Sequence, residues 1–279
     1  SASSLSDFAQ CAYRHFAGRG LGLAERDAAA DDGLSPLVAG EIAHRALETV
    51  FTDGHDAPVA FDAAWAEHAG HLRPTLAPRR DRERLRPAVV GLVAHEAATP
   101  FAPGFEPVHA ELAFGPGGHA VTVGGAPGVA LKGRIDRVLA DGAGRTVVLD
   151  WKWQTLDKFG GLAQRIADRR DVQLPLYALA VERALGLRVV AAGLVALRDP
   201  GFRARWLRLD VAAPGTSRAD VDWTGDARDR ELGELEAHVV AADARIRAGG
   251  IAVDPTDEER CGPGRCSFAD LCRYDGGAL

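Results

Sequence analysis

Several residue types and patterns that mark common protein classes are missing from this chain. Its 279 residues include no Met, so we expect Ser1 to follow a trimmed initiator or to begin a piece cut from a longer protein. No apolar run approaches the ~20 residues of a membrane span, and no charged and apolar leader opens the chain. These absences predict a soluble, cytoplasmic protein without a membrane partner.

Three enzyme motifs are also missing. The chain has no Gly-x-x-x-x-Gly-Lys-Ser/Thr loop, and its Gly-rich stretch at residues 18–22 does not meet the dinucleotide fingerprint. It has no Gly-x-Ser-x-Gly elbow of the kind that presents a catalytic serine. The sequence therefore excludes a P-loop motor within this chain.

An excess of positive charge is missing as well, because 33 Lys and Arg oppose 39 Asp and Glu, for a net charge of −6. This balance argues against a protein that binds nucleic acid through its whole surface. It does not exclude a nuclease, whose metal site is itself built from carboxylates. Arg residues are dense only locally, as between positions 79 and 86, and such a run by itself is more typical of a solvated face.

The spacing of apolar residues predicts helices, then strands, then further helices. The predicted helices are 4–17, capped by Ser4, one that opens at Ser35-Pro36, and others near 61–72, 81–98, 171–185 and 227–247. The predicted strands are 108–114, 119–123 and 129–139, which form a meander, followed by 146–153, 189–197 and 202–209. This order is typical of an α/β fold.

The composition, 47% hydrophobic and 26% charged, suits one large domain or two closely merged lobes. We expect a single domain over residues 1–279. Its helical front section spans 1–100, its catalytic α/β core 108–210, and its C-terminal helix and Cys cluster 226–279.

Two of the predicted strands each carry an Asp in an apolar setting. Asp136 lies in the run Gly-Arg-Ile-Asp-Arg, and Asp150 lies in the run Val-Val-Leu-Asp-Trp-Lys. Because side chains alternate faces along a strand, Asp150 and Lys152 project to one side, and Trp151 and Trp153 project to the other. If the strands are neighbours, two carboxylates and one ammonium meet, which suits a hard divalent cation and a phosphodiester. The spacing predicts a nuclease-like centre.

The four cysteines are split between the two ends of the chain, as Cys11 and then Cys261, Cys266 and Cys272. In a cytosolic protein such a set favours a metal or cluster site over disulfides. Four thiolates suit an iron-sulfur cluster or a tetrahedral zinc, and free buried thiols are a third interpretation. A shared site would clamp the first helix to the C-terminal tail and stabilise the fold by on the order of several kcal/mol.

Taken together, the motifs resemble the PD-(D/E)XK nuclease superfamily, in particular its RecB/AddB-type group with an iron-sulfur cluster. The resemblance covers nearly the whole chain. The opening Ser-Ala-Ser-x-Leu and the Cys-x-Tyr-x-x-Phe stretch that begins at Cys11 resemble the start of AddB-type nuclease domains. Gly40-x-x-x-His44 matches the helix that carries a metal-binding His. Asp136 and Asp150-x-Lys152 match the two catalytic strands, and Gln173-x-x-x-Tyr177 matches the helix that follows.

The resemblance implies a restriction-endonuclease-like core, with a central mixed sheet flanked by helices, a helical N-terminal section and a Cys-rich C-terminal staple. It implies that Mg²⁺ or Mn²⁺ is held by His44, Asp136, Asp150 and the backbone carbonyl of Trp151. Lys152 would orient the attacking water or stabilise charge on the phosphate.

Two further sets of residues receive roles from the same resemblance. Gln173 and Tyr177, one helical turn apart, would steady Lys152 and the DNA backbone. A 4Fe-4S cluster, with Zn²⁺ as the alternative, would be held by Cys11, Cys261, Cys266 and Cys272. Glu111 on the first strand is an additional candidate ligand, although a structural edge charge is the favoured interpretation.

The implied activity is that of a metal-dependent DNA exonuclease acting on single-stranded ends in recombinational repair. Such an enzyme works alone or as the nuclease domain of a helicase-nuclease, with a helicase or ATPase module in the same protein or complex as its partner. The alternative is a catalytically silent nuclease-like domain that binds DNA or a partner. The intact set of Asp136, Asp150 and Lys152 argues against that alternative.

This chain departs from the usual pattern of the group at a few positions. Four residues separate its first two C-terminal thiols where two are usual, and Ala12 stands where Pro is common. Trp151 and Trp153 replace the more usual Tyr and Thr or Ser around Lys152. These Trp residues leave the carboxylates and Lys152 untouched, and their indoles could pack in the core or, at Trp153, sit near the substrate.

Overall fold

A six-stranded mixed sheet forms the centre of the protein, in the order β1-β4-β5-β6-β7-β8. The computed structural model describes residues 1–23, 33–73, 75–125, 128–214, 219–258, 261–262 and 265–274. The strands are β1 (Glu106–Phe114), β4 (Gly133–Ala140), β5 (Arg145–Lys152), β6 (Arg188–Ala196), β7 (Ala204–Arg208) and β8 (Val221–Asp222). The β5–β6 and β7–β8 pairs are parallel and the others antiparallel, which confirms the α/β fold with a mixed sheet.

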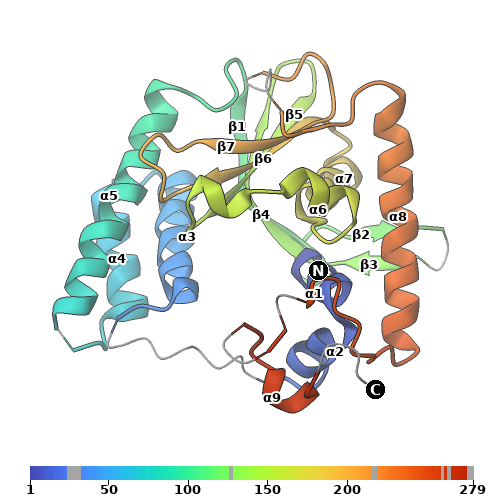
Figure 1. The fold of residues 1–279 in the computed structure, drawn as a ribbon. Helices are drawn as coiled ribbons and strands as arrows, with labels where there is room; N and C mark the ends of the chain where they lie inside the picture. Colours follow the sequence, from blue (N-terminus) through green and yellow to red (C-terminus); the bar gives the residue numbers. More distant parts are fainter. Residues whose placement is uncertain are drawn as a thin grey trace.

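Three long helices of the front section cover one face of the sheet (Figure 1). They are α3 (Pro36–Asp53), α4 (Ala57–Ala69) and α5 (Leu76–Ala98). The predicted start of α3 is confirmed, because the Ser35 side chain accepts a hydrogen bond from the Val38 N–H and Pro36 occupies the first turn. Gly54, with φ 70°, ends that helix in the left-handed conformation that glycine adopts without strain.

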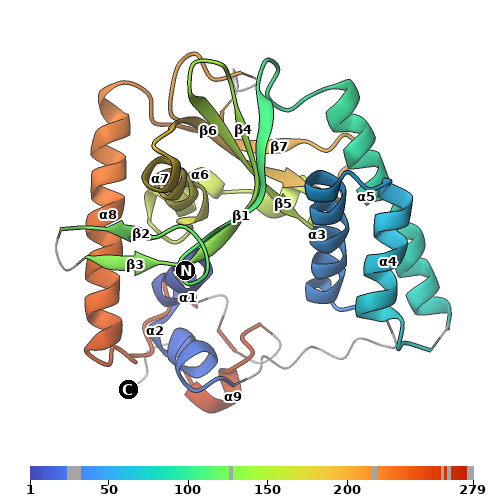
Figure 2. The same cartoon turned by 180° about the vertical axis from the view of Figure 1, so that it is seen from behind.

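The second face of the sheet is covered by α7 (Gln173–Leu185), beyond which lies α8 (Asp226–Arg247), as Figure 2 shows from behind. The connection between β5 and α7 contains η2 (Leu156–Phe159) and α6 (Leu162–Ala167). Alternation along β5 explains the two cores, because Val148 joins the α7 side while Leu149 and Trp151 join the α3–α5 side. None of the helices in the described part of the chain is long and apolar enough to cross a membrane.

The two ends of the chain meet beside α7 and α8. The first segment contains α1 (Ala2–Gln10), α2 (Ala12–His15) and the π-helical turn η1 (Phe16–Gly20), and the last contains α9 (Ala269–Cys272). The prediction of one helix capped by Ser4 is wrong: Ser1 caps α1, and the chain is extended at Cys11. The break occurs because the Ala12 N–H donates to the Asp254 carboxylate instead of continuing the helix (2.8 Å).

The predicted meander is also wrong. β2 (Val121–Val123) and β3 (Val129–Leu131) form a separate two-stranded sheet, and β1 pairs directly with β4. The run 129–139, expected as one strand, is divided at Lys132. At the next residue, Gly133, a Cβ would lie 2.5 Å from the Phe114 ring. The Phe114 ring occupies the space that a side chain at position 133 would need, and β2–β3 packs instead against α7 and α8.

Candidate active site

The central sheet forks between β4 and β5. Their shared ladder runs from Ala140↔Thr146 to Arg137↔Leu149 and ends there. Beyond that point β4 stays paired with β1, while β5 stays paired with β6 as far as Lys152. Asp136 and Asp150 are therefore the first residues past the shared ladder, one on each arm of the fork. The Trp151 N–H crosses the gap and donates to Asp136 Oδ2 at 2.5 Å.

The arm formed by β5 carries Asp150 and Lys152 toward α7. The Lys152 Nζ lies 2.6 Å from Asp150 Oδ2, and the Gln173 side-chain amide donates to Asp150 Oδ1 at 2.7 Å. The same amide nitrogen lies 3.1 Å from the Tyr177 hydroxyl, one helical turn further along α7. The expected alternation is present, because Trp151 packs on the opposite face with α3–α5. The structure thus brings Asp150, Lys152, Gln173 and Tyr177 together.

The other arm brings three potential metal ligands to one place. His44 on α3 has its Nδ1 3.2 Å from Asp136 Oδ1, and Glu111 on β1 joins them, so that one ligand atom of each lies within 4.8 Å of the others. The β1–β4 register pairs Ala110 with Arg137 and Leu112 with Ile135, which places Glu111 opposite Asp136. Glu111 has a φ of 53°, a strained backbone conformation for a residue other than glycine.

The sequence-based interpretation of Glu111 as a structural edge charge did not predict that it groups with His44 and Asp136. Glu111 does lie on the edge strand β1, but its side chain is only 11% exposed and shares the site with His44. The signal that identifies it is the β1–β4 register, which the predicted meander obscured. Asp150 lies outside the group of three, and its oxygens contact Lys152 and Gln173.

Burial and neighbouring charges shift the pKa of four groups at the fork. Burial opposes protonation of His44, but the hydrogen bond and charge of Asp136 outweigh it and raise the pKa to about 9. Burial and the Asp136 charge raise the pKa of Glu111 to about 7. Burial likewise raises the pKa of Asp150, whereas the Asp150 charge overcomes burial and raises the pKa of Lys152. Such crowding of acidic groups is relieved by a divalent cation.

The donor set fits a divalent metal. Carboxylate oxygens of Asp136 and Glu111 and the imidazole of His44 form a mixed oxygen and nitrogen set, which suits Mn²⁺ and tolerates Mg²⁺. Asp150 Oδ2 is buried and, despite its closeness to Lys152 Nζ, makes no hydrogen bond of good geometry. It is therefore a further acceptor that a cation or a metal-bound water can satisfy.

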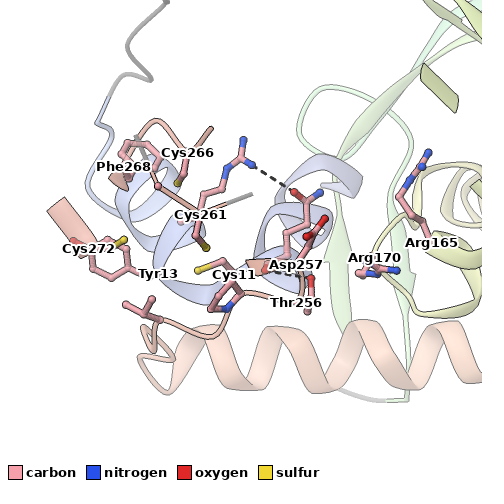
Figure 3. Close-up of a pocket in the computed structure, with 15 residues that line it drawn as sticks. Cys11, Tyr13, Arg165, Arg170, Thr256, Asp257, Cys261, Cys266, Phe268 and Cys272 are labelled. Carbon is pink, nitrogen blue, oxygen red and sulfur yellow. Dashed lines mark hydrogen bonds between the residues drawn. The ribbon is translucent and has the colours of Figure 1, made fainter. Parts of the chain in front are cut away.

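The four cysteines gather at a second place, where the two ends of the chain meet. Cys11, Cys261, Cys266 and Cys272 all line one pocket and none forms a disulfide (Figure 3). Burial and the neighbouring thiols raise the pKa of Cys261. In the described residues no three of these sulfurs lie within 4.8 Å of one another.

Comparison with known families gives one result. The family model described as the PD-(D/E)XK nuclease superfamily matches residues 1–273, which is nearly the whole chain. No curated protein matches the sequence significantly.

Proposed function

Because this chain belongs to the PD-(D/E)XK nuclease superfamily, we propose that it is a metal-dependent DNA exonuclease that acts on single-stranded ends in recombinational repair. It is of the RecB/AddB type and works alone or as the nuclease domain of a helicase-nuclease. One observation carries the proposal: His44, Glu111 and Asp136 converge at the fork beside Asp150 and Lys152.

In the proposed site His44, Asp136 and Glu111 hold Mg²⁺ or Mn²⁺, and Asp150 contributes directly or through water. The backbone carbonyl of Trp151 completes the set. Its N–H already points at Asp136, and the N–H and C=O of one strand residue point to the same edge. When bound, the ion lowers the pKa of water and withdraws charge from the phosphate.

In this proposal Lys152 orients the attacking water. Its raised pKa keeps it protonated at neutral pH, so it donates hydrogen bonds and stabilises negative charge on the phosphate, rather than acting as a base. Gln173 fixes the Asp150 carboxylate, and Tyr177 lies within hydrogen-bond distance of the Gln173 amide. This chain of contacts from α7 supports the proposal that Gln173 and Tyr177 position Asp150 and, through it, Lys152.

We further propose that the four cysteines hold a 4Fe-4S cluster, with Zn²⁺ as the alternative. Their shared pocket supports a common ligand. The cluster would join the ends of one domain over residues 1–279. In support, the Thr256 N–H donates to the Gln10 carbonyl at 3.0 Å and the Tyr13 N–H to the Ala252 carbonyl at 3.0 Å.

The test is digestion of single- and double-stranded DNA, labelled at the 5′ or the 3′ end, with Mg²⁺ or Mn²⁺. We expect the protein to shorten single strands progressively, and Asp150→Ala and Lys152→Ala each to reduce the rate by at least about 10²-fold. Equal cutting by the wild type and both variants would indicate a contaminating nuclease. A protein that binds metal and DNA but cuts neither substrate would be the silent binding domain.

A further inference from the structure

A cavity of about 650 Å³ lies on the α3–α5 face of the sheet, outside the set of residues proposed for catalysis. Its walls come from the first turns of α3, the middle of α5 and the turn between β6 and β7. Apolar side chains such as Leu85 and Phe202 line it, together with Trp153 and two arginines, Arg84 and Arg198. Its size is that of a small-molecule site, commonly about 300–1,000 Å³.

Two elements connect this cavity to the fork. Trp153 lies three residues after Asp150, in the bend that follows β5, where the Gln154 N–H donates to the Lys152 carbonyl at 2.7 Å. Ala39 lines the cavity from α3, and His44 follows it by five residues, about 7.5 Å along the helix. Consecutive nucleotides of an extended single strand can span such a distance, so one strand can reach both places.

The charges at the cavity favour an anionic ligand. The Arg198 guanidinium lies 5.8 Å from the centre of the Trp153 ring, and neither it nor the Arg84 side chain forms an ion pair within the described ranges. The two acids of the lining are already engaged. Asp81 accepts from the Leu34 N–H, and Asp199 accepts from the Leu156 N–H and from Arg203. An aromatic plane beside two available guanidinium groups suits a base and a phosphate.

We infer that this cavity receives one nucleotide of the single-stranded DNA substrate, with its base stacked on Trp153 and its phosphate bound by Arg84 and Arg198. The inference rests on the proposed nuclease function. It makes Trp153 a residue that determines preference for unpaired strands. A base in a duplex would have to break its base pair before it could enter the cavity.

The experiment uses the full chain with Asp150→Ala, so that DNA is bound without being cut. The probe is an oligodeoxythymidylate carrying a single 2-aminopurine, moved one position at a time along the strand. We expect the fluorescence to be quenched most strongly at one position, and this quenching to be lost with Trp153→Leu. Trp153→Leu should weaken binding by about 5- to 100-fold, and Trp153→Phe should restore most of it.

The arginines are tested with a matched pair of variants. Arg198→Ala should weaken binding and reduce its dependence on salt, because one phosphate contact is lost, whereas Arg230→Ala, on the exposed side of α8, should leave both unchanged. Circular dichroism and urea unfolding establish that each variant is folded.

Two results would overturn the inference, and they differ from each other. If Trp153→Leu binds the probe as the parent does, and cuts single strands normally with Asp150 restored, the cavity is not a nucleotide site and the nuclease proposal stands. If the wild-type protein neither binds nor cuts DNA with Mn²⁺, the nuclease proposal fails and the inference falls with it.

Discussion

At the scale of single residues, the fork sets the properties of the site. Asp150 and Lys152 could be placed on one face from their spacing alone, because alternation along a strand is a local property. The partnership of Glu111 with Asp136 could not, because it depends on which strands pair. Glu111 and Asp136 then share a small volume at the fork, and burial together with the Asp136 charge disfavours ionisation of Glu111.

Replacing Glu111 tests this crowding. Its pKa rises from 4.5 to about 7 on folding, so the metal-free protein should lose stability as the pH rises from about 4.5 to 7, where the unfolded chain has already released the proton. Glu111→Gln removes this penalty. We expect it to be on the order of 2 kcal/mol more stable than the wild type at pH 8 in chelator, and equally stable near pH 4.5. Urea unfolding at both pH values measures the difference.

The matched control is Glu67→Gln, an exposed carboxylate on α4, which should change the unfolding free energy by less than about 0.5 kcal/mol. Added Mn²⁺ should reverse the order, because the wild type binds it more tightly than Glu111→Gln. A variant that is less stable than the wild type at pH 8 in chelator would contradict the crowding of Glu111.

At the scale of elements, local signals placed the long helices well and the short strands poorly. The Ser35 cap and Pro36 identified the start of α3, and the apolar stripe of α8 was sufficient to locate that helix. The extended residue at Cys11 and the separation of β2–β3 were missed, since both depend on contacts with distant parts of the chain. A helix satisfies its own backbone, whereas a strand needs a partner that the local sequence does not specify.

The Ser35 cap supports the helix that carries His44. Ser35→Ala removes the acceptor of the Val38 N–H and should lower the unfolding free energy by about 1 kcal/mol. Ser35→Asp keeps an acceptor at the same position and should remain close to the wild type. Denaturant titrations of the three proteins measure the free energy of unfolding. An equal decrease in Ser35→Ala and Ser35→Asp would show that the lost stability does not come from the cap.

At the scale of the whole molecule, the ends of the chain are joined beside α7 and α8, away from the α3–α5 layer (Figure 1). The 1+3 division of the cysteines along the sequence predicts this closure, because the proposed cluster would need all four thiols.

Loss of one thiol tests the closure. Cys11→Ala should lose iron and acid-labile sulfide together. Its free energy of unfolding should fall by on the order of several kcal/mol, because the long loop is no longer closed. Metal analysis and visible absorbance of anaerobically purified protein separate iron-sulfur from zinc. Chelator-treated wild type is the control and should match the variant. A variant that keeps both cofactor and stability would contradict the shared site.

The sequence by itself determined the family, the order of helices and strands, and the shared face of Asp150 and Lys152. These follow from local periodicity, capping and motif spacing, which are properties of neighbouring residues. Tertiary structure alone decided that β1 pairs with β4 across the separate β2–β3 hairpin, and that the sheet forks at Asp136 and Asp150. It also decided that Glu111 joins His44 and that Trp153 lines a cavity, because such meetings depend on packing between segments that are distant in the chain.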